Sequence, residues 1–318
     1  MRWLFLLPVV LISGCTVPFI GIDVPWGNTI SLENDVIVIT KLTAIPDKAT
    51  PPQAIRLLAT IQNQGQREFG TGPDAITTSA IPIVVDLYDF CEGLFEKVEV
   101  TCPDQVPHEG TTCEIKELLP KESREVSWTL TPSPDTKLVT PCTLKISASY
   151  PYETSGLTTV HFINSDEYNR QLDQGTFVPK SSTVSLGDGP VKAWFEVKDQ
   201  QPVPAAPTPG DSVIPVSLMI ENKGLGFVRE LPDGTGQVKL VATNIFSPPF
   251  SAKVDGCSFA VNQGIRLIQD ERSLPCHITQ PADEDILKET TRQLTVDISY
   301  VYEFRDDIKV TVEAPFEV

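Results

Sequence analysis

The sequence is poor in basic residues and in histidine. Its 318 residues include 25 Lys and Arg against 42 Asp and Glu, which gives a formal net charge of −17, and only 3 His. A nucleic-acid-binding surface needs clustered basic side chains, so we predict no nucleic-acid partner. Charged residues make up 21% of the chain, slightly below the average of about 25%. The negative balance therefore reflects scarce Lys and Arg rather than a dense acidic surface.

A hydrophobic run long enough to cross a membrane is also missing. The apolar stretch from Trp3 to Ile12 is about half as long as the ~20 residues that a spanning helix needs. It follows the basic residue Arg2 and precedes two small residues and Cys15, which is the layout of an export signal. We therefore expect residues 1–14 to be a signal peptide.

The last residues of this signal, Ile12-Ser13-Gly14-Cys15, resemble the lipobox of prokaryotic lipoproteins. In such proteins a peptidase cleaves before the cysteine, whose thiol carries a thioether-linked lipid. The resemblance implies that Cys15 is a lipid attachment site and that the protein is anchored to the outer face of the membrane, at the cell surface. Residues 15–34 would then form a flexible tether. The alternative is an ordinary secretory signal beside an unmodified cysteine.

Motifs of the common catalytic and phosphate-binding sites are absent as well. The chain contains no GxSxG, HExxH, GxxxxGK[ST] or GxGxxG pattern. We accordingly predict a non-enzymatic protein without a catalytic residue, a metal site or a cofactor. His108 and His277 stand near cysteines, so a zinc site is an alternative, but no CxxC or HxxxH spacing supports it.

Proline, by contrast, is abundant at 28 residues, which disfavours long helices and suits short strands joined by turns. Strands are predicted at residues 36–42, 55–62, 83–90, 97–101, 113–118, 125–130, 144–150, 158–162, 193–197, 213–221, 238–243, 265–268, 294–300 and 308–313. The most helix-like segment is 165–174. Many short strands without intervening helices predict an all-β protein built from antiparallel β-sandwiches.

Three segments recur in the same order later in the chain. Their pairs are Ile61–Gly65 with Ile220–Gly224, Leu144–Glu153 with Leu294–Glu303, and the stretch from Phe95 through Cys102 and Cys113 with the stretch from Phe250 through Cys257 and Cys276. This self-similarity predicts a tandem duplication. We expect one sandwich at 35–164, a linker with a short helix at 165–190 and a second sandwich at 191–318.

The cysteines support export. With Cys15 as the lipid carrier, 7 − 1 = 6 cysteines remain, an even number that fits three disulfides in an oxidising compartment. Because Cys102 and Cys113 recur as Cys257 and Cys276, we predict that this pair bonds in both copies. Cys91 and Cys142, which have no counterpart, then bond to each other.

Parts of the first copy resemble the cell-adhesion-related (CARDB-type) Ig-like domain of bacterial and archaeal surface proteins. The likeness rests on Leu42–Pro46, on the strand from Ile55 that closes with Asn63-Gln-Gly65, and on Ile115–Pro132. The whole chain is also similar to uncharacterised archaeal surface lipoproteins. The resemblance implies tandem Ig-like sandwiches without catalytic residues. The second copy departs from the pattern, since it has no clear counterpart of Leu118-Leu-Pro120.

Three aromatic residues receive structural assignments from the strand pattern. Trp128 alternates with hydroxyl residues and is expected in the core. Tyr150 and Tyr300 close matched strands, so we expect each hydroxyl to bond nearby backbone.

These features predict a lipid-anchored structural, adhesion or protein-interaction module at the cell surface. Its partners would be the membrane, through the lipid, and a protein or surface polymer. The alternative is a lipoprotein that captures a ligand or glycan for a transporter or envelope machinery, with a cleft near Trp194. A hydrolase with an unfamiliar site, using His161 or His277, is a third hypothesis.

Overall fold

The computed structural model describes residues 34–69, 82–103, 105–205, 213–231, 234, 236–246, 254–255, 264–279 and 286–314. Within these residues the regular structure consists of β-strands and one helix, α1 (Ser165–Asp173). The contacts group Leu32–Val318 into one compact unit. The prediction of an all-β sandwich fold is confirmed, and the helix lies where the sequence predicted it.

One outer sheet is built from the first part of the chain. Its order is β1 (Ile37–Ile45), β3 (Ile55–Asn63), β8 (Ser123–Pro132), β5 (Phe95–Thr101) and β6 (His108–Glu109), and all of its pairings are antiparallel. The alternation of apolar and polar residues explains the orientation of these strands, because every second side chain of β3 and β8 is buried. Trp128 lies at the centre of β8 and is completely buried, which confirms its assignment to the core.

A second outer sheet is built from the later part of the chain. Its order is β11 (Val191–Val197), β13 (Val213–Asn222), β18 (Glu271–Thr279) and β16 (Val254–Asp255), which parallels β1, β3, β8 and β5. The strand β18 was not predicted, because proline and polar residues interrupt its apolar pattern. Leu274, Cys276 and Ile278 nevertheless alternate as its buried positions.

The position of β18 in this sheet shows that one of the three sequence matches, that of Cys113 with Cys276, is wrong. Cys113 lies in β7 (Thr112–Ile115), which pairs with β4 (Ile83–Asp89). Cys276 lies instead in β18, the positional counterpart of β8. A shared Cys-x-Ile pattern records alternating burial, and alternating burial alone does not identify which strand of a sandwich it belongs to.

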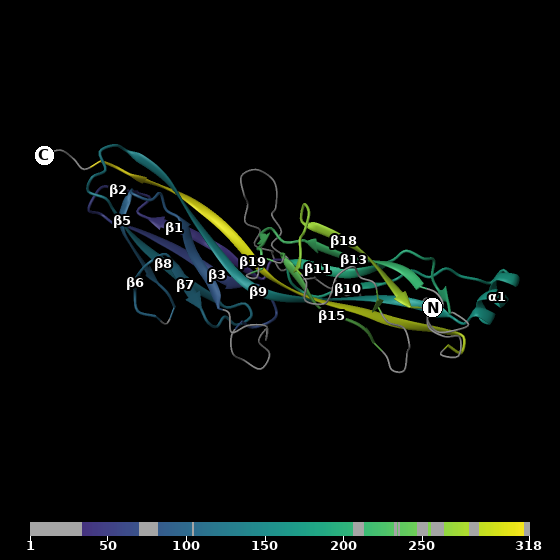
Figure 1. The fold of residues 1–318 in the computed structure, drawn as a ribbon. Helices are drawn as coiled ribbons and strands as arrows, with labels where there is room; N and C mark the ends of the chain where they lie inside the picture. The colour runs from purple at the N-terminus through teal and green to yellow at the C-terminus, as the bar shows by residue number, and fades with distance from the viewer. Residues whose placement is uncertain are drawn as a thin grey trace, which may run out of the picture. The chain divides into compact units, whose positions relative to one another are not determined.

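The central sheet faces both outer sheets. Its order is β17 (Gly264–Ile265), β15 (Val238–Phe246), β19 (Glu289–Val312), β9 (Thr140–Ile163), β4 and β7. Four short strands pair with the free edges of β9 and β19: β2 (Lys48–Ala49), β10 (Val184–Leu186), β12 (Val203–Pro204) and β14 (Phe227–Val228). Figure 1 shows β9 in teal and β19 in yellow running side by side through this sheet.

The two long strands differ most from the prediction. Each has 24 residues, and they pair without interruption from Thr140 opposite Val312 to Ile163 opposite Glu289. The strands predicted separately at 144–150 and 158–162 are thus one strand, as are those at 294–300 and 308–313. Backbone hydrogen bonds between the two strands carry the ladder across the intervening residues, where the apolar pattern is weaker.

The predicted boundaries therefore do not divide these strands. The first half of β9 pairs with β4, whereas its second half carries β10 and β12. Likewise β19 pairs first with β15 and later with β2. Each long strand starts in the sandwich of its own part of the chain and ends in the other one. The segment 165–190 is consequently not a linker between separate bodies, and the Asn164 N–H at the start of α1 donates to the Lys288 carbonyl at 2.8 Å.

Candidate functional site

The predicted disulfides are the first candidate positions. Cys91 bonds to Cys142 and Cys102 bonds to Cys113, with Cα–Cα distances of 6.0 and 5.6 Å, as predicted. Cys276 is also disulfide-bonded. Its predicted partner Cys257 and the predicted lipid carrier Cys15 lie outside the residues that the structure describes, so those assignments stay predictions.

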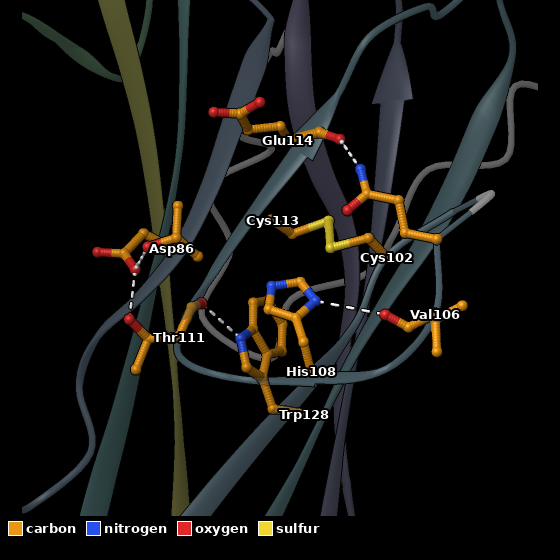
Figure 2. Close-up of a disulfide and its surroundings, with 10 residues drawn as sticks. Asp86, Cys102, Val106, His108, Thr111, Cys113, Glu114 and Trp128 are labelled. Carbon is orange, nitrogen blue, oxygen red and sulfur yellow. Dashed lines mark hydrogen bonds between the residues drawn. A yellow bond between two sulfur atoms is a disulfide. The ribbon is translucent and has the colours of Figure 1, made fainter.

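The Cys102–Cys113 bridge joins two layers of the fold (Figure 2). Cys102 follows β5 of an outer sheet, and Cys113 belongs to β7 of the central sheet. Both cysteines are buried. Close by, the Trp128 indole donates to the carbonyl of Thr111 at 2.6 Å, which also ties one sheet to the other. The surroundings are those of a structural crosslink.

Two of the cysteines that a zinc site would need cannot bind metal in this arrangement. Cys102 and Cys113 are bonded to each other, and a thiolate is needed for metal binding. The exposed His108 contacts the Val106 carbonyl through Nδ1 at 3.4 Å. Among the described residues, no group of three or more His, Cys, Asp or Glu side chains has the geometry to hold a metal ion.

Four tyrosines meet where β9 and β19 pass between the sandwiches. Tyr150 lies opposite Tyr302, and Tyr152 lies opposite Tyr300. All four are at most 2% exposed, and neighbouring ring centroids are 5.8 to 6.5 Å apart. Stacked and edge-to-face aromatic pairs at such distances contribute beyond their buried area. We call this group the tyrosine junction.

The prediction that Tyr150 and Tyr300 bond local backbone is wrong, because their hydroxyls bond backbone that is distant in sequence. Tyr150 accepts from the Val36 N–H at 3.4 Å, and Tyr300 accepts from the Val191 N–H at 3.3 Å. Val36 directly precedes β1, and Val191 begins β11. The junction therefore holds the first strand of each outer sheet against the central sheet.

Two carboxylates next to these strands reach the opposite half of the fold. Asp35 accepts from the Leu225 N–H at 3.0 Å, and Asp188 lies 3.8 Å from Arg67 Nε. Burial raises the pKa of the Asp35 carboxyl, although the hydrogen bond from Leu225 opposes that shift. The two carboxylates thus connect the two halves of the fold.

Matched asparagines shape the loops that receive these carboxylates. Asn63 closes β3, donates through Nδ2 to the Arg67 carbonyl and accepts from the Gly65 N–H. Asn222 closes β13 and makes the same two bonds, to Gly226 and Gly224. The repeated Asn-x-Gly pattern of the sequence therefore marks one loop conformation that occurs twice.

A hollow of about 380 Å³ opens beside Trp194. Its lining includes the half-buried Trp194 together with Ser182, Glu196 and Asp199. His161, the histidine singled out for a hydrolase, lies on β9, and its Nδ1 is 3.0 Å from the Thr291 hydroxyl. No metal-type cluster of the described residues includes it.

Sequence reasoning missed the buried carboxylate of Glu303. Glu303 is 3% exposed and bonds two arginines, Arg229 through Oε2 at 2.8 Å and Arg305 through Oε1. Both Glu303 and Arg305 occupy outward positions of β19, two residues apart. A Glu-x-Arg pair on the polar face of a strand was the available signal, but polar residues there are normally exposed to solvent.

No protein-family model matches the chain, and no curated protein is significantly similar to it. In the described part of the chain, the single helix is too short and too polar to cross a membrane.

Proposed function

We propose that the protein is a lipid-anchored, non-enzymatic extracytoplasmic protein that acts as a structural or protein-interaction module at the cell surface. In this proposal the chain is a tandem duplication of a CARDB-type Ig-like domain, and Cys15 carries the lipid. The body formed by the described residues then lies outside the membrane at the end of the tether.

The disulfides are the observation that carries this proposal. Five cysteines of the described residues are oxidised: Cys91, Cys142, Cys102, Cys113 and Cys276. Structural disulfides persist in oxidising compartments and are rare in reducing ones, which supports export. Sandwiches that share long strands and a buried tyrosine junction are suited to mechanical continuity, which supports a structural role.

Substitution of the lipid carrier tests the proposal directly. We expect Cys15→Ser, expressed in the native host, to shift the protein from the membrane fraction to the soluble extracytoplasmic fraction, because the tether loses its acyl chains. The matched control is Ser13→Ala, which should remain with the membrane. Intact mass of the wild-type protein should include the lipid, and thiol labelling without reductant should find no free cysteine. Soluble wild-type protein with reduced cysteines would contradict the proposal.

A second candidate function is capture of a glycan or other polar ligand. It is favoured by the hollow beside Trp194, where an indole lies next to hydroxyl and carboxylate groups. An aromatic ring with a few polar groups is the usual lining of a small-ligand site. Titration with oligosaccharides should then change the tryptophan fluorescence of the wild type and leave that of Trp194→Ala unchanged. Equal responses from the two proteins would exclude this site.

A further inference from the structure

A cluster of half-exposed aromatic, apolar and arginine side chains covers β19 where it passes between the sandwiches. Its members come from three separate segments of the chain: Tyr88 in β4, Leu225, Phe227 and Arg229 along the loop and strand β14, and Arg305 in β19. We call it the arginine–aromatic patch. The proposed function leaves it unexplained.

The segment that carries Leu225 and Phe227 is held firmly. Leu225 is 49% exposed and Phe227 is 53% exposed, whereas the residues between and after them face inward. The Gly226 N–H donates to the Tyr302 hydroxyl at 2.7 Å, and the Arg229 N–H donates to the Val301 carbonyl at 2.8 Å. Because the backbone is fixed on both sides of Phe227, a partner would lose little entropy in ordering it.

Arg305 is positioned between the two aromatic rings. Its guanidinium carbon lies 4.8 Å from the centroid of Phe227 and 5.4 Å from that of Tyr88. Its Nε binds Glu303, which also accepts from Arg229. Two guanidinium groups thus share one buried carboxylate and leave a surplus positive charge, while the side chains of Arg305 and Arg229 remain 47% and 55% exposed.

The strand pairing does not require an arginine at this position. The position of β9 that matches Arg305 in the sequence repeat is Ser155, whose hydroxyl donates to Asp297 at 2.6 Å. The same strand position therefore works with a short polar side chain. Among the described residues, the arginine–aromatic patch occurs on one half, which argues for a role other than maintaining the sheet.

The chemistry of the patch selects its partner. Arginine and aromatic residues dominate the energetic centres of protein interfaces, and arginine binds carboxylates in a planar, two-point geometry. A polyanion would be repelled by a chain of net charge −17. We propose that the arginine–aromatic patch binds a short segment of a partner protein in which a carboxylate lies beside apolar side chains. The carboxylate pairs with Arg305 and Arg229, and the apolar side chains cover Phe227 and Leu225. This inference rests on the proposed role as an interaction module.

Site-specific crosslinking in the native host tests it. p-Benzoylphenylalanine replaces Leu225, which leaves Phe227, Tyr88 and both arginines in place, and the control site is the 45% exposed Val184 of β10. After irradiation, mass spectrometry should identify a protein segment captured at position 225, and not at 184, that contains Asp or Glu next to apolar residues. Arg305→Gln in the same protein should reduce the capture about tenfold.

A synthetic peptide of the captured segment then separates charge recognition from simple contact. It should bind the purified protein at least tenfold more tightly than its amide version, in which Asn and Gln replace Asp and Glu. Arg305→Lys, which keeps the charge but loses the planar fork, should weaken binding about fivefold, with an unchanged melting temperature as the check on folding. Absence of capture at 225 above the level at 184, a captured segment without a carboxylate, or equal binding of the amide peptide would each overturn the proposal. The Cys15→Ser result would be unaffected, so the two proposals can fail separately.

Discussion

Single residues of this protein act mainly by connecting layers. Trp128 fills the space between an outer sheet and the central sheet, and its indole N–H bonds across that space to Thr111. Asp35 makes a comparable connection with its carboxylate, which reaches the backbone of Leu225. Both are buried polar contacts, so their loss leaves a donor or acceptor without a partner.

We expect Trp128→Phe to lower the free energy of unfolding by about 3 kcal/mol, because it removes the hydrogen bond to Thr111 and leaves a void in the core. Trp194→Phe is the matched control, since Trp194 is only partly buried, and should cost about 1 kcal/mol or less. Urea denaturation of the two variants measures the difference. Equal costs would show that the Trp128 contact does not carry the expected energy.

We predict that the stability of the protein depends on pH through Asp35. Its pKa is raised from the ordinary value of 3.8, chiefly by burial, so the folded state binds this proton more tightly than the unfolded chain does. The stability that the protonated carboxyl contributes is fully present below pH 3.8, the pKa of the unfolded chain. This stability is lost as the pH rises through the raised pKa of the folded state. Asn cannot ionise, so we expect the stability of Asp35→Asn relative to wild type to increase from pH 3 to pH 7. Asp135→Asn, in an exposed loop, is the control, and a flat difference for Asp35→Asn would contradict the prediction.

At the scale of elements, the close packing of β11 on β9 depends on a glycine. A Cβ at Gly156 would lie 1.7 Å from the Ala193 carbonyl oxygen. Thr158, two residues further along β9, fixes the same contact, since its hydroxyl bonds both the N–H and the carbonyl of Phe195. The outer sheet therefore reaches the central sheet through backbone rather than through interdigitated side chains at this point.

Gly156→Ala should accordingly destabilise the protein by about 3 kcal/mol or more, because backbone atoms have to move apart. Gly175→Ala provides the comparison. That glycine has a φ of +64° but no atom near the added Cβ, so only the cost of a left-handed alanine, about 1 kcal/mol, is expected. Thermal and urea unfolding give both values. A Gly156→Ala variant as stable as Gly175→Ala would refute the close approach.

For the whole molecule, the shared strands make the two sandwiches interdependent. The buried side chains form one continuous hydrophobic cluster that includes residues of both outer sheets and of the central sheet. Tyr150, Tyr152, Tyr300 and Tyr302 lie within it. Neither sandwich keeps its full central sheet when the other unfolds, because β9 and β19 would lose half of their partners.

We therefore expect a single cooperative unfolding transition. Calorimetry should give a ratio of calorimetric to van't Hoff enthalpy near one. Two independent sandwiches of this size would instead give two transitions. Gly156→Ala, which alters the contact of β9 with β11, should shift the entire transition to lower temperature. A variant that unfolds in two steps, with only one step shifted, would contradict this coupling.

Much of the local structure could be predicted from the sequence. The alternation in β3, β8 and β13 and the helix at α1 depend on residues whose burial or spacing is visible in the chain. The pairing of Cys91 with Cys142 was predicted through the match of Cys113 with Cys276, and the pairing is correct although that match is wrong. The strand β18 was not predicted, because its polar residues obscure the alternation in the sequence. The alternation is recognised only once the structure shows which face of the strand is buried.

What the sequence by itself determined is the strand-forming pattern, the position of the helix and the repeated Asn-x-Gly loops. Only the tertiary structure decided that β9 and β19 each continue from one sandwich into the other, and that Glu303 is buried between two arginines. The physical reason is that alternation specifies which face of a strand is buried, but not its partner. The partner of a strand is set by long-range hydrogen bonding and packing, and the tyrosine junction combines both.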